Sequence, residues 1–328
     1  MSIRKGKDST KLGLVTGGSA KRALARDGSC KRGRERSRLD IGSGVAKGKA
    51  QTASAIRGRV LADAKPRNVR DGSTRGLAKT SSRSDVVLER ILFVPDCHRP
   101  YHDERAWQLV LAAARSFRPD HIVVLGDFGD FYSVSSHDKN PNRRNNLEYE
   151  ITSIIDGLAE LAAIGGELHF VSGNHEDRLE RYLMQKSPEL YNLVRIRELL
   201  RLDDTGWKYT PYRCHFKLGH LYVTHECGNA GPMASSKARD TFQGNVVIGH
   251  THRMAMNYQG NARGEAHVGA MFGWLGDVEQ IDYAHSVQSA QWQLGFGIGH
   301  KEPNGTVHLQ AIPIVDYKCV LGGVLYRG

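Results

Sequence analysis

Side chains suited to binding metal ions recur at five places along this 328-residue sequence. Aspartate, asparagine and histidine supply oxygen and nitrogen atoms, which bind divalent cations of hard or borderline character. Residues two apart in an extended chain point the same way, so Asp96 and His98 can share one ion, and His250 and His252 can reach one cluster. The five places are Asp96-Cys97-His98, GDFGD at 126–130, GNHE at 173–176, His225, and GHTH at 249–252.

Each of these segments by itself has a simpler explanation. Asp96 and His98 fit a surface turn or a helix cap, GNHE fits a turn with a solvated acid, and His225 fits a histidine packed in the core. The ordered set favours metal binding instead, because all of its donors come directly after strand-like runs and no thiolate pair is among them. The predicted donors are Asp96, His98, Asp127, Asn174, His225, His250 and His252.

Hydrophobic patterning predicts the elements that must hold these donors. Apolar runs at 91–96, 122–125 and 168–171 are typical of buried strands, and apolar residues at helical spacing predict helices over 103–117 and 151–161. This β-α-β-α-β order indicates a mostly parallel sheet covered by helices. In such sheets ligands bind beyond the carboxyl ends of the strands, so donors from different strands can meet there.

The second half of the sequence predicts a different mixture of elements. Residues 176–202 have the pattern of a helix with a break near Pro188, and short strand-like runs separated by glycine-rich turns follow from Trp207 onward. We expect these runs to form a mixed or antiparallel sheet. Three glycines before the donors should let the backbone bend sharply and approach the site; they are Gly126, Gly173 and Gly249.

Residues 1–90 differ in composition from the rest of the chain. They hold 23 Lys and Arg against 8 Asp and Glu, a net charge of +15, whereas residues 91–328 carry a net charge of −4. The segment has no aromatic residue but 12 Gly and 11 Ser, so it cannot bury enough apolar surface to offset the entropy of the chain. We therefore predict a disordered basic tail over 1–90 and one α/β domain over 91–328.

The charge of this tail favours a nucleic-acid partner. A flexible segment with a net charge of +15 can bind DNA or RNA by neutralising phosphates, whatever the base sequence. The alternatives are a solvated linker, an upstream extension of the reading frame, or a transit peptide.

The longest unbroken apolar run, 109–114, is too short to cross a bilayer, and no N-terminal run is typical of a signal peptide. We expect a cytoplasmic protein without membrane contact, of undetermined oligomeric state.

The ordered series DCH, GDFGD, GNHE, a lone histidine and GHTH resembles the calcineurin-like metallophosphoesterase superfamily, and the resemblance covers residues 91–328. It implies an α/β fold, a four-layer α/β/β/α sandwich with two central mixed sheets. It also implies a centre of two divalent metal ions, with Mn favoured over Fe, Zn, Ni, Co or Mg. One ion would be held by Asp96, His98 and His252, the other by Asn174, His225 and His250, and Asp127 would bridge both.

The same resemblance implies an activity. The chain would be a metal-dependent phosphoester hydrolase whose nucleophile is a metal-bridging hydroxide. His175, next to the predicted ligand Asn174, would donate the proton that the leaving alkoxide needs. Asp130 would orient His175 and favour its protonated form, although an aspartate at this position also fits a turn or a helix cap.

One position departs from the pattern of the superfamily. Its protein phosphatases carry an arginine directly after the second aspartate of GDFGD, where it binds the phosphate, but this chain has Phe131. A Ser/Thr protein phosphatase is therefore disfavoured, and the basic tail fits the nuclease and phosphodiesterase branches of the superfamily, so we favour a phosphodiesterase or nuclease-like enzyme over a phosphomonoesterase or protein phosphatase. A non-catalytic scaffold that binds nucleic acid is disfavoured because all expected ligands and His175 are present. The arginines that could replace the missing one are Arg143, Arg144, Arg178 and Arg181.

Overall fold

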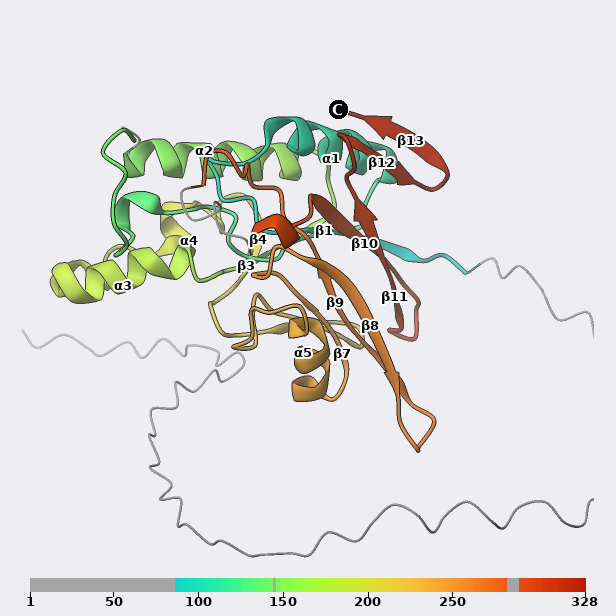
Figure 1. Cartoon of the computed structure of the whole chain (residues 1–328). Coiled ribbons are helices and arrows are strands. Elements are labelled where there is room, and N and C mark those ends of the chain that lie inside the picture. The colour runs from blue at the N-terminus through green and yellow to red at the C-terminus, as the bar shows by residue number, and fades with distance from the viewer. Residues whose placement is uncertain (1–85, 144–145, 282–288) are drawn as a thin grey trace, which may run out of the picture. The chain divides into compact units, whose positions relative to one another are not determined.

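A computed structural model describes residues 86–143, 146–281 and 289–328 of the chain (Figure 1). Residues 1–85 of the predicted basic tail lie outside this part, so its disorder and its nucleic-acid contact stay predictions. The first strand begins at Glu89, two residues before the expected start of the α/β domain. None of the helices among the described residues is long and apolar enough to span a bilayer.

The first of the two central sheets contains six strands in the order β11-β10-β1-β2-β3-β4. Its strands β1 to β4 run parallel to one another, as the β-α-β-α-β pattern predicts, while β10 and β11 pair antiparallel at one side. The strands are β1 (Glu89–Val94), β2 (His121–Val124), β3 (Glu167–Val171), β4 (Trp207–Thr210), β10 (Gly295–Lys301) and β11 (Val307–Pro313).

The second central sheet contains five strands in the order β5-β6-β7-β9-β8. Its inner pairs β6–β7 and β7–β9 are parallel and its outer pairs are antiparallel, so both central sheets are mixed, which confirms the expected fold. A separate hairpin of β12 and β13 follows. The strands are β5 (Phe216–Leu218), β6 (Leu221–Val223), β7 (Asn245–Ile248), β8 (Met254–Gly260), β9 (Ala266–Phe272), β12 (Lys318–Leu321) and β13 (Val324–Arg327).

Five α-helices lie in the described residues, and local signals explain where the long ones begin. The Asp103 side chain accepts a hydrogen bond from the Ala106 N–H and so caps the first helix, and Asn146 caps the second in the same way. The helices are α1 (Glu104–Phe117), α2 (Leu147–Ala162), α3 (Glu176–Lys186), α4 (Ile196–Leu199) and α5 (Ala234–Phe242).

The predicted helix over 176–202 is only partly right. Helix α3 ends at Lys186, because Pro188 lacks an N–H and the residue before a proline disfavours helical geometry. A 3₁₀ turn over Pro188–Leu190 and the short α4 replace the rest of the expected helix. Helix α5 was not predicted from the sequence.

Successive side chains of β1 point alternately toward the helices and toward the second sheet, which shows the order of the layers. Leu92 and Val94 pack in the cluster that contains the buried faces of α1 and α2, whereas Ile91 and Phe93 pack against residues of the second sheet. On the outer face of the second sheet, α5 contacts β7 and β9 through Ala234. Figure 1 shows α1 and α2 on one side of the paired sheets and α5 on the other. The result is the expected α/β/β/α order.

Candidate metal centre

All five donor segments follow strands and meet in space, as the sequence analysis predicts. Hydrogen bonds donated by backbone N–H groups join the loops that carry them. The His98 N–H donates to the Asp127 carbonyl at 2.9 Å, and the His250 N–H donates to Asp96 Oδ1 at 2.8 Å. The His175 N–H donates to Asp127 Oδ1, also at 2.8 Å. The loops after β1, β2, β3 and β7 therefore position one another.

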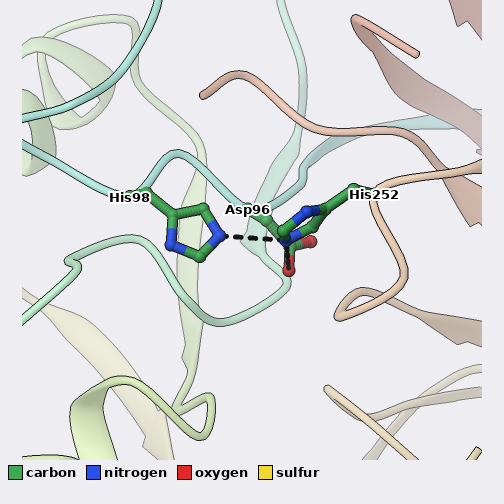
Figure 2. Close-up of side chains that lie close together, drawn as sticks. All are labelled: Asp96, His98 and His252. Carbon is green, nitrogen blue, oxygen red and sulfur yellow. Dashed lines mark hydrogen bonds and ion pairs between the residues drawn. The ribbon is translucent and has the colours of Figure 1, made fainter. Parts of the chain in front are cut away.

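One group of donors consists of Asp96, His98 and His252, whose ligand atoms all lie within 4.8 Å of one another. The two histidine rings approach through their Nε2 atoms at 3.0 Å, and His252 Nε2 lies 3.7 Å from Asp96 Oδ1. Figure 2 shows the side chains of Asp96 and His98, from the loop after β1, and of His252, from the loop after β7, lying close together. All three are buried. This is the set that the sequence analysis assigned to one ion.

The other group consists of Asn174, His225 and His250, next to Asp127. Asn174 Oδ1 lies 3.0 Å from His225 Nε2 and 2.8 Å from His250 Nδ1. Asp127 Oδ2 lies 3.3 Å from His225 Nε2. Asp127 also approaches His98 of the first group, with ligand atoms within 4.8 Å. Its carboxylate thus lies between the two groups.

Two of the predicted histidine ligands form hydrogen bonds through Nδ1, the nitrogen that faces away from the centre. The lone pair on Nε2 is then available to a metal ion. His225 Nδ1 donates to the Leu125 carbonyl at 2.8 Å, and His98 Nδ1 lies 3.3 Å from Asp130 Oδ2. A neutral ring that donates from Nδ1 presents an unprotonated Nε2. Metal-binding histidines have such an outer partner in most proteins. These two rings are oriented as ligands.

The electrostatics of the centre fit a cation. Asp96 Oδ2 is buried and has no hydrogen-bond partner among the described residues, and burial raises the pKa of this carboxyl to about 7. Burial also lowers the pKa of His252 well below its usual value, with His98 adding to the effect, so this ring is neutral. At Asp127, burial opposes ionisation, but His225 and His175 hold its pKa well below the usual range. At His225, burial opposes the charged form, but Asp127 raises the pKa of this ring to about 10, so a metal ion at the centre would take the place of that proton.

The backbone at the donors adopts a conformation that residues other than glycine rarely take. The φ angles are 55° at His98, 46° at Asp127, 67° at His250 and 56° at His252. Such a residue costs on the order of 1–3 kcal/mol and persists only where the surrounding structure enforces it. Strained residues cluster at functional sites, and here they coincide with four predicted ligands.

The predicted close approach of the glycines is confirmed at all three positions; at Gly249 a Cβ atom would lie 2.9 Å from Asp96 Oδ2. A Cβ atom at Gly126, where φ is 93°, would lie 2.4 Å from His225 Nδ1. A Cβ atom at Gly173 would lie 2.1 Å from Asp127 Oδ1. Any side chain at these positions would displace a predicted ligand.

Glu176 is a residue to which the sequence analysis gave no role. Its carboxylate is fully buried and accepts three backbone hydrogen bonds, from Asp127 at 3.0 Å, Gly129 at 2.9 Å and Gly173 at 2.7 Å. Burial, with a contribution from Asp127, raises the pKa of Glu176 to about 7. The side chain joins the loops after β2 and β3. It is therefore a positioning residue and not the solvated acid of a turn.

Replacing Glu176 by Gln is expected to destabilise the protein by about 1–3 kcal/mol, because an amide N–H would face the buried Gly129 N–H. Chemical denaturation measures the change, and metal titration should show weaker binding, since the Asp127 loop loses its anchor. The matched control is Glu189→Gln, which changes an exposed side chain. Equal stability of the two variants would contradict the positioning role.

The predicted pair of His175 and Asp130 comes together, with Arg178 as a third member. His175 Nδ1 lies 3.0 Å from the Asp130 carbonyl oxygen and 3.4 Å from its Oδ2. Arg178 donates to Asp130 Oδ1 at 3.2 Å, and its other nitrogen lies 3.0 Å from His175 Nε2. Burial opposes ionisation of Asp130, but His175 and His98 hold the pKa of this carboxyl well below its usual range.

The other candidate arginines lie differently. Arg181 pairs with Asp177 at 3.1 Å, and its side chain is 52% exposed. Arg143 lies over the Tyr101 ring at 4.1 Å, and Arg144 falls outside the described residues. Phe131 is fully buried in the core, so its position offers no contact to phosphate. Arg178 is thus a described candidate that contacts both His175 and Asp130.

A further group of donors lies at the opposite ends of β2 and β3. It contains His121, Glu167 and His169, with ligand atoms within 4.8 Å of one another. Lys208 already forms an ion pair with Glu167 there, and burial lowers the pKa of His169 to about 4. A lysine ammonium therefore already supplies a positive charge to this group.

Comparison with known proteins identifies the family. Residues 89–254, half of the chain, match the model of the calcineurin-like phosphoesterases. The chain belongs to this family. As a calcineurin-like phosphoesterase it is a phosphoester hydrolase of a family that uses divalent metals, and its buried donor groups are candidates for binding them. The resemblance drawn from the sequence motifs is confirmed.

Similar proteins come from mycobacteriophages. The chain is 26% identical over 261 residues to the gene 54 protein of Mycobacterium phage D29, covering 74% of this chain and 100% of that protein. It is 25% identical over 233 residues to the gene 54 protein of Mycobacterium phage L5, covering 65% and 89%.

Among solved structures, this calcineurin-like phosphoesterase is similar to vacuolar protein sorting 29 from Cryptosporidium parvum. The TM-score is 0.38 at 13% identity over 73% of this chain and 94% of that one. It is also similar to YfcE, a phosphoesterase from E. coli, with a TM-score of 0.32 at 15% identity, covering 68% and 98%.

Proposed function

We propose that this calcineurin-like phosphoesterase is a phosphodiesterase with a centre of two divalent metal ions. The observation that carries the proposal is the position of Asp127, whose carboxylate lies within 4.8 Å of donor atoms in both groups. A carboxylate can bridge two cations, because it offers two oxygens and a charge that offsets their repulsion. One ion is assigned to Asp96, His98 and His252, and the other to Asn174, His225 and His250.

When bound, the two ions lower the pKa of water and offset the charge of the phosphoryl oxygens. In this proposal, residues of the chain hold the ions, donate the proton and bind the phosphate. Four histidines and Asn174 hold the ions without adding negative charge, so they do not repel an anionic substrate. We favour manganese, although histidine, aspartate and asparagine donors also suit Fe, Zn, Ni, Co or Mg.

His175 is assigned the role of general acid, oriented by Asp130. Its Nδ1 is directed at the Asp130 carbonyl oxygen at 3.0 Å, so its Nε2 is the atom that can carry a proton to the leaving oxygen. Nε2 lies 3.9 Å from Asp127 Oδ2, on the side of the metal centre. Both roles rest on this geometry and await a test.

Arg178 is assigned the phosphate contact that Phe131 does not supply. Its guanidinium lies 3.0 Å from His175 Nε2, and its side chain is 12% exposed. A guanidinium binds two phosphate oxygens at once, and its planar shape suits this better than an ammonium. On substrate binding it would turn from His175 to the phosphate and leave Nε2 to the leaving group.

Replacing Arg178 by Ala is expected to lower kcat/KM about 10- to 100-fold, the effect of losing one charge-assisted contact, mainly through a higher KM. Arg178→Lys should restore only part of the loss. Steady-state kinetics measure both variants. The control is Arg197→Ala, an exposed arginine of α4 that pairs with Asp203. Similar effects of both alanine substitutions would contradict a specific phosphate contact.

The preference for diesters rests on charge. A phosphodiester carries one negative charge, whereas a monoester carries up to two and needs more cationic contacts. Phe131 takes the place of the arginine that the protein phosphatases of the family carry, and the charge of Arg178 is offset by its ion pair with Asp130. The test compares turnover of bis-p-nitrophenyl phosphate and p-nitrophenyl phosphate by the manganese-loaded protein. Faster diester turnover supports the proposal, and faster monoester turnover favours a phosphomonoesterase or protein phosphatase instead.

Two further predictions remain part of the proposal. The tail over 1–90, with its net charge of +15, is proposed to bind DNA or RNA. A cytoplasmic location is likewise expected.

The alternative of a non-catalytic scaffold is disfavoured, because all seven predicted ligands converge and His175 lies beside them.

A further inference from the structure

Three side chains that can bind a metal ion meet at the N-terminal ends of β2 and β3. They are His121, Glu167 and His169, and their ligand atoms all lie within 4.8 Å of one another. Glu167 and His169 are two apart in β3 and therefore lie on the same face, and the parallel register places His121 of β2 beside Glu167. The candidate metal centre follows the C-terminal ends of the same strands, so the two groups of donors are separate.

The face that carries these side chains packs against the second sheet. Val123 and Val171 lie on the same face of β2 and β3, and both belong to the cluster that contains residues of that sheet. The His169 ring stacks on Phe216 of β5, with ring centroids 4.8 Å apart and an interplanar angle of 1°. His121 is 9% exposed and His169 is 6% exposed. Both histidine rings are therefore held in place without a metal ion.

One nitrogen of each ring lacks the hydrogen bond that a buried nitrogen normally forms. His121 Nδ1 and His169 Nε2 are buried and have no hydrogen-bond partner in the described part of the chain. His169 Nε2 lies 2.9 Å from Glu167 Oε1, so these two atoms are in contact without the angles of a hydrogen bond. Two ligands of a tetrahedral zinc ion lie about 3.3 Å apart, given metal–ligand distances of about 2.0–2.2 Å. A shared metal ion explains both the contact and the unpartnered nitrogens.

Glu89 supplies the outer hydrogen bond that orients a metal-binding histidine. His121 Nε2 lies 2.6 Å from Glu89 Oε2, and Lys301 pairs with the same carboxylate oxygen at 2.8 Å. A neutral ring that donates from Nε2 presents an unprotonated Nδ1. A carboxylate on the outer side of a histidine ligand is common at zinc sites. His121 is therefore oriented to bind a metal ion through Nδ1.

Lys208 competes with a metal ion for this group of donors. Its ammonium pairs with Glu167 Oε1 at 2.5 Å, but the lysine side chain is 62% exposed and that of Glu167 is 41% exposed. An ion pair this exposed contributes little to stability, so a divalent cation can displace the ammonium into water. The exposed side of Glu167 also gives an ion a path to the buried histidines.

We propose that His121, Glu167 and His169 bind one zinc ion, with water in the fourth position. Two imidazoles and one carboxylate form a zinc-binding set in many proteins. Nitrogen and oxygen donors bind zinc more tightly than manganese, so this site differs in preference from the centre assigned to manganese. The ion replaces the Lys208 ammonium next to Glu167 and links the first residues of β2 and β3. The inference is independent of the proposed function, because the two sites share no ligand.

Anomalous diffraction at the zinc edge tests the site directly, on crystals of the full chain soaked in a large volume of micromolar Zn²⁺. We expect a peak about 2.0–2.2 Å from a ring nitrogen of His121, a ring nitrogen of His169 and an oxygen of Glu167. Glu167→Ala should lose this peak and keep the peaks at the candidate metal centre. The absence of a peak at these residues in the wild type, or a peak that needs millimolar zinc, would overturn the inference.

Equilibrium dialysis with elemental analysis measures the same site in solution. Glu167→Ala should bind one zinc ion fewer per chain than the wild type. Lys208→Gln removes the competing charge and should tighten zinc binding at this site about three- to tenfold, the scale of a close charge–charge interaction in water. The matched controls are Glu189→Ala and Lys186→Gln, which change exposed side chains of the same types and should alter neither quantity.

The variants distinguish the possible failures. Equal zinc content of Glu167→Ala and Glu189→Ala would overturn the inference. His169→Ala should also lose this zinc ion, and thermal unfolding verifies that the variant is folded. Retention of the ion by folded His169→Ala would likewise overturn it. If zinc binds at His121, Glu167 and His169 but no metal binds at the candidate metal centre, the proposed function is wrong and this inference stands.

Discussion

Replacing Asp127 by Asn is expected to lower kcat by at least about 10³-fold and to reduce the bound metal from two ions to one or none. The amide keeps the shape and one oxygen, but it loses the charge that offsets repulsion between two cations. Unit charges 4 Å apart interact by about 4 kcal/mol at a protein surface, and that energy corresponds to roughly a 10³-fold change in an equilibrium constant.

Steady-state kinetics and elemental analysis of metal content measure this variant. The control is Asp156→Asn, which removes the same charge from an exposed position on α2 and should leave both quantities unchanged. Thermal unfolding verifies that Asp127→Asn remains folded. A folded variant with two bound ions and wild-type kcat would show that Asp127 bridges nothing.

Replacing His175 by Asn is expected to lower kcat about 10²- to 10⁴-fold for diesters with alkyl leaving groups, while metal content stays the same. The reason is that an alkoxide needs a proton as it departs, and an amide cannot supply one. For p-nitrophenyl esters the loss should be much smaller, because p-nitrophenolate is a stable anion. The contrast between the two kinds of leaving group is the signature of a general acid.

A structural role for His175 would give a different result, because both kinds of substrate would then lose activity equally. The control is His137→Asn, an exposed histidine in the loop after β2. Full activity of His175→Asn on alkyl esters would assign the proton donation to another group.

The strand ends of the site could be predicted from the sequence because their signals are local. Ile91 to Val94 is an apolar run that leads directly to Asp96, and the structure places β1 over Glu89–Val94. Ligands at the carboxyl ends of parallel strands meet at one edge of a sheet, so the order of the motifs was enough to bring the loop of Asp96 and His98 near Asp127, whose carbonyl accepts a hydrogen bond from the His98 N–H. The contact between Asp96 and His250 joins the two sheets and could not be derived in this way.

The remaining features depend on contacts between distant residues. Glu176 accepts hydrogen bonds from the backbone of Asp127 and Gly129, and nothing in the letters GNHE distinguishes a buried acid from a solvated one. Helix α5 was missed because it buries mainly small or polar residues, such as Ala234 and Ala238, which give little hydrophobic periodicity. The positive φ angles at the donors likewise arise from tertiary structure and leave no mark on the sequence.

The most direct test of the metal centre is anomalous X-ray diffraction from crystals of the protein grown with Mn²⁺. We expect two anomalous peaks about 3.5–4 Å apart. One should lie among Asp96, His98 and His252, the other among Asn174, His225 and His250, with Asp127 in contact with both. A single peak, or two peaks of which Asp127 touches at most one, would contradict this arrangement.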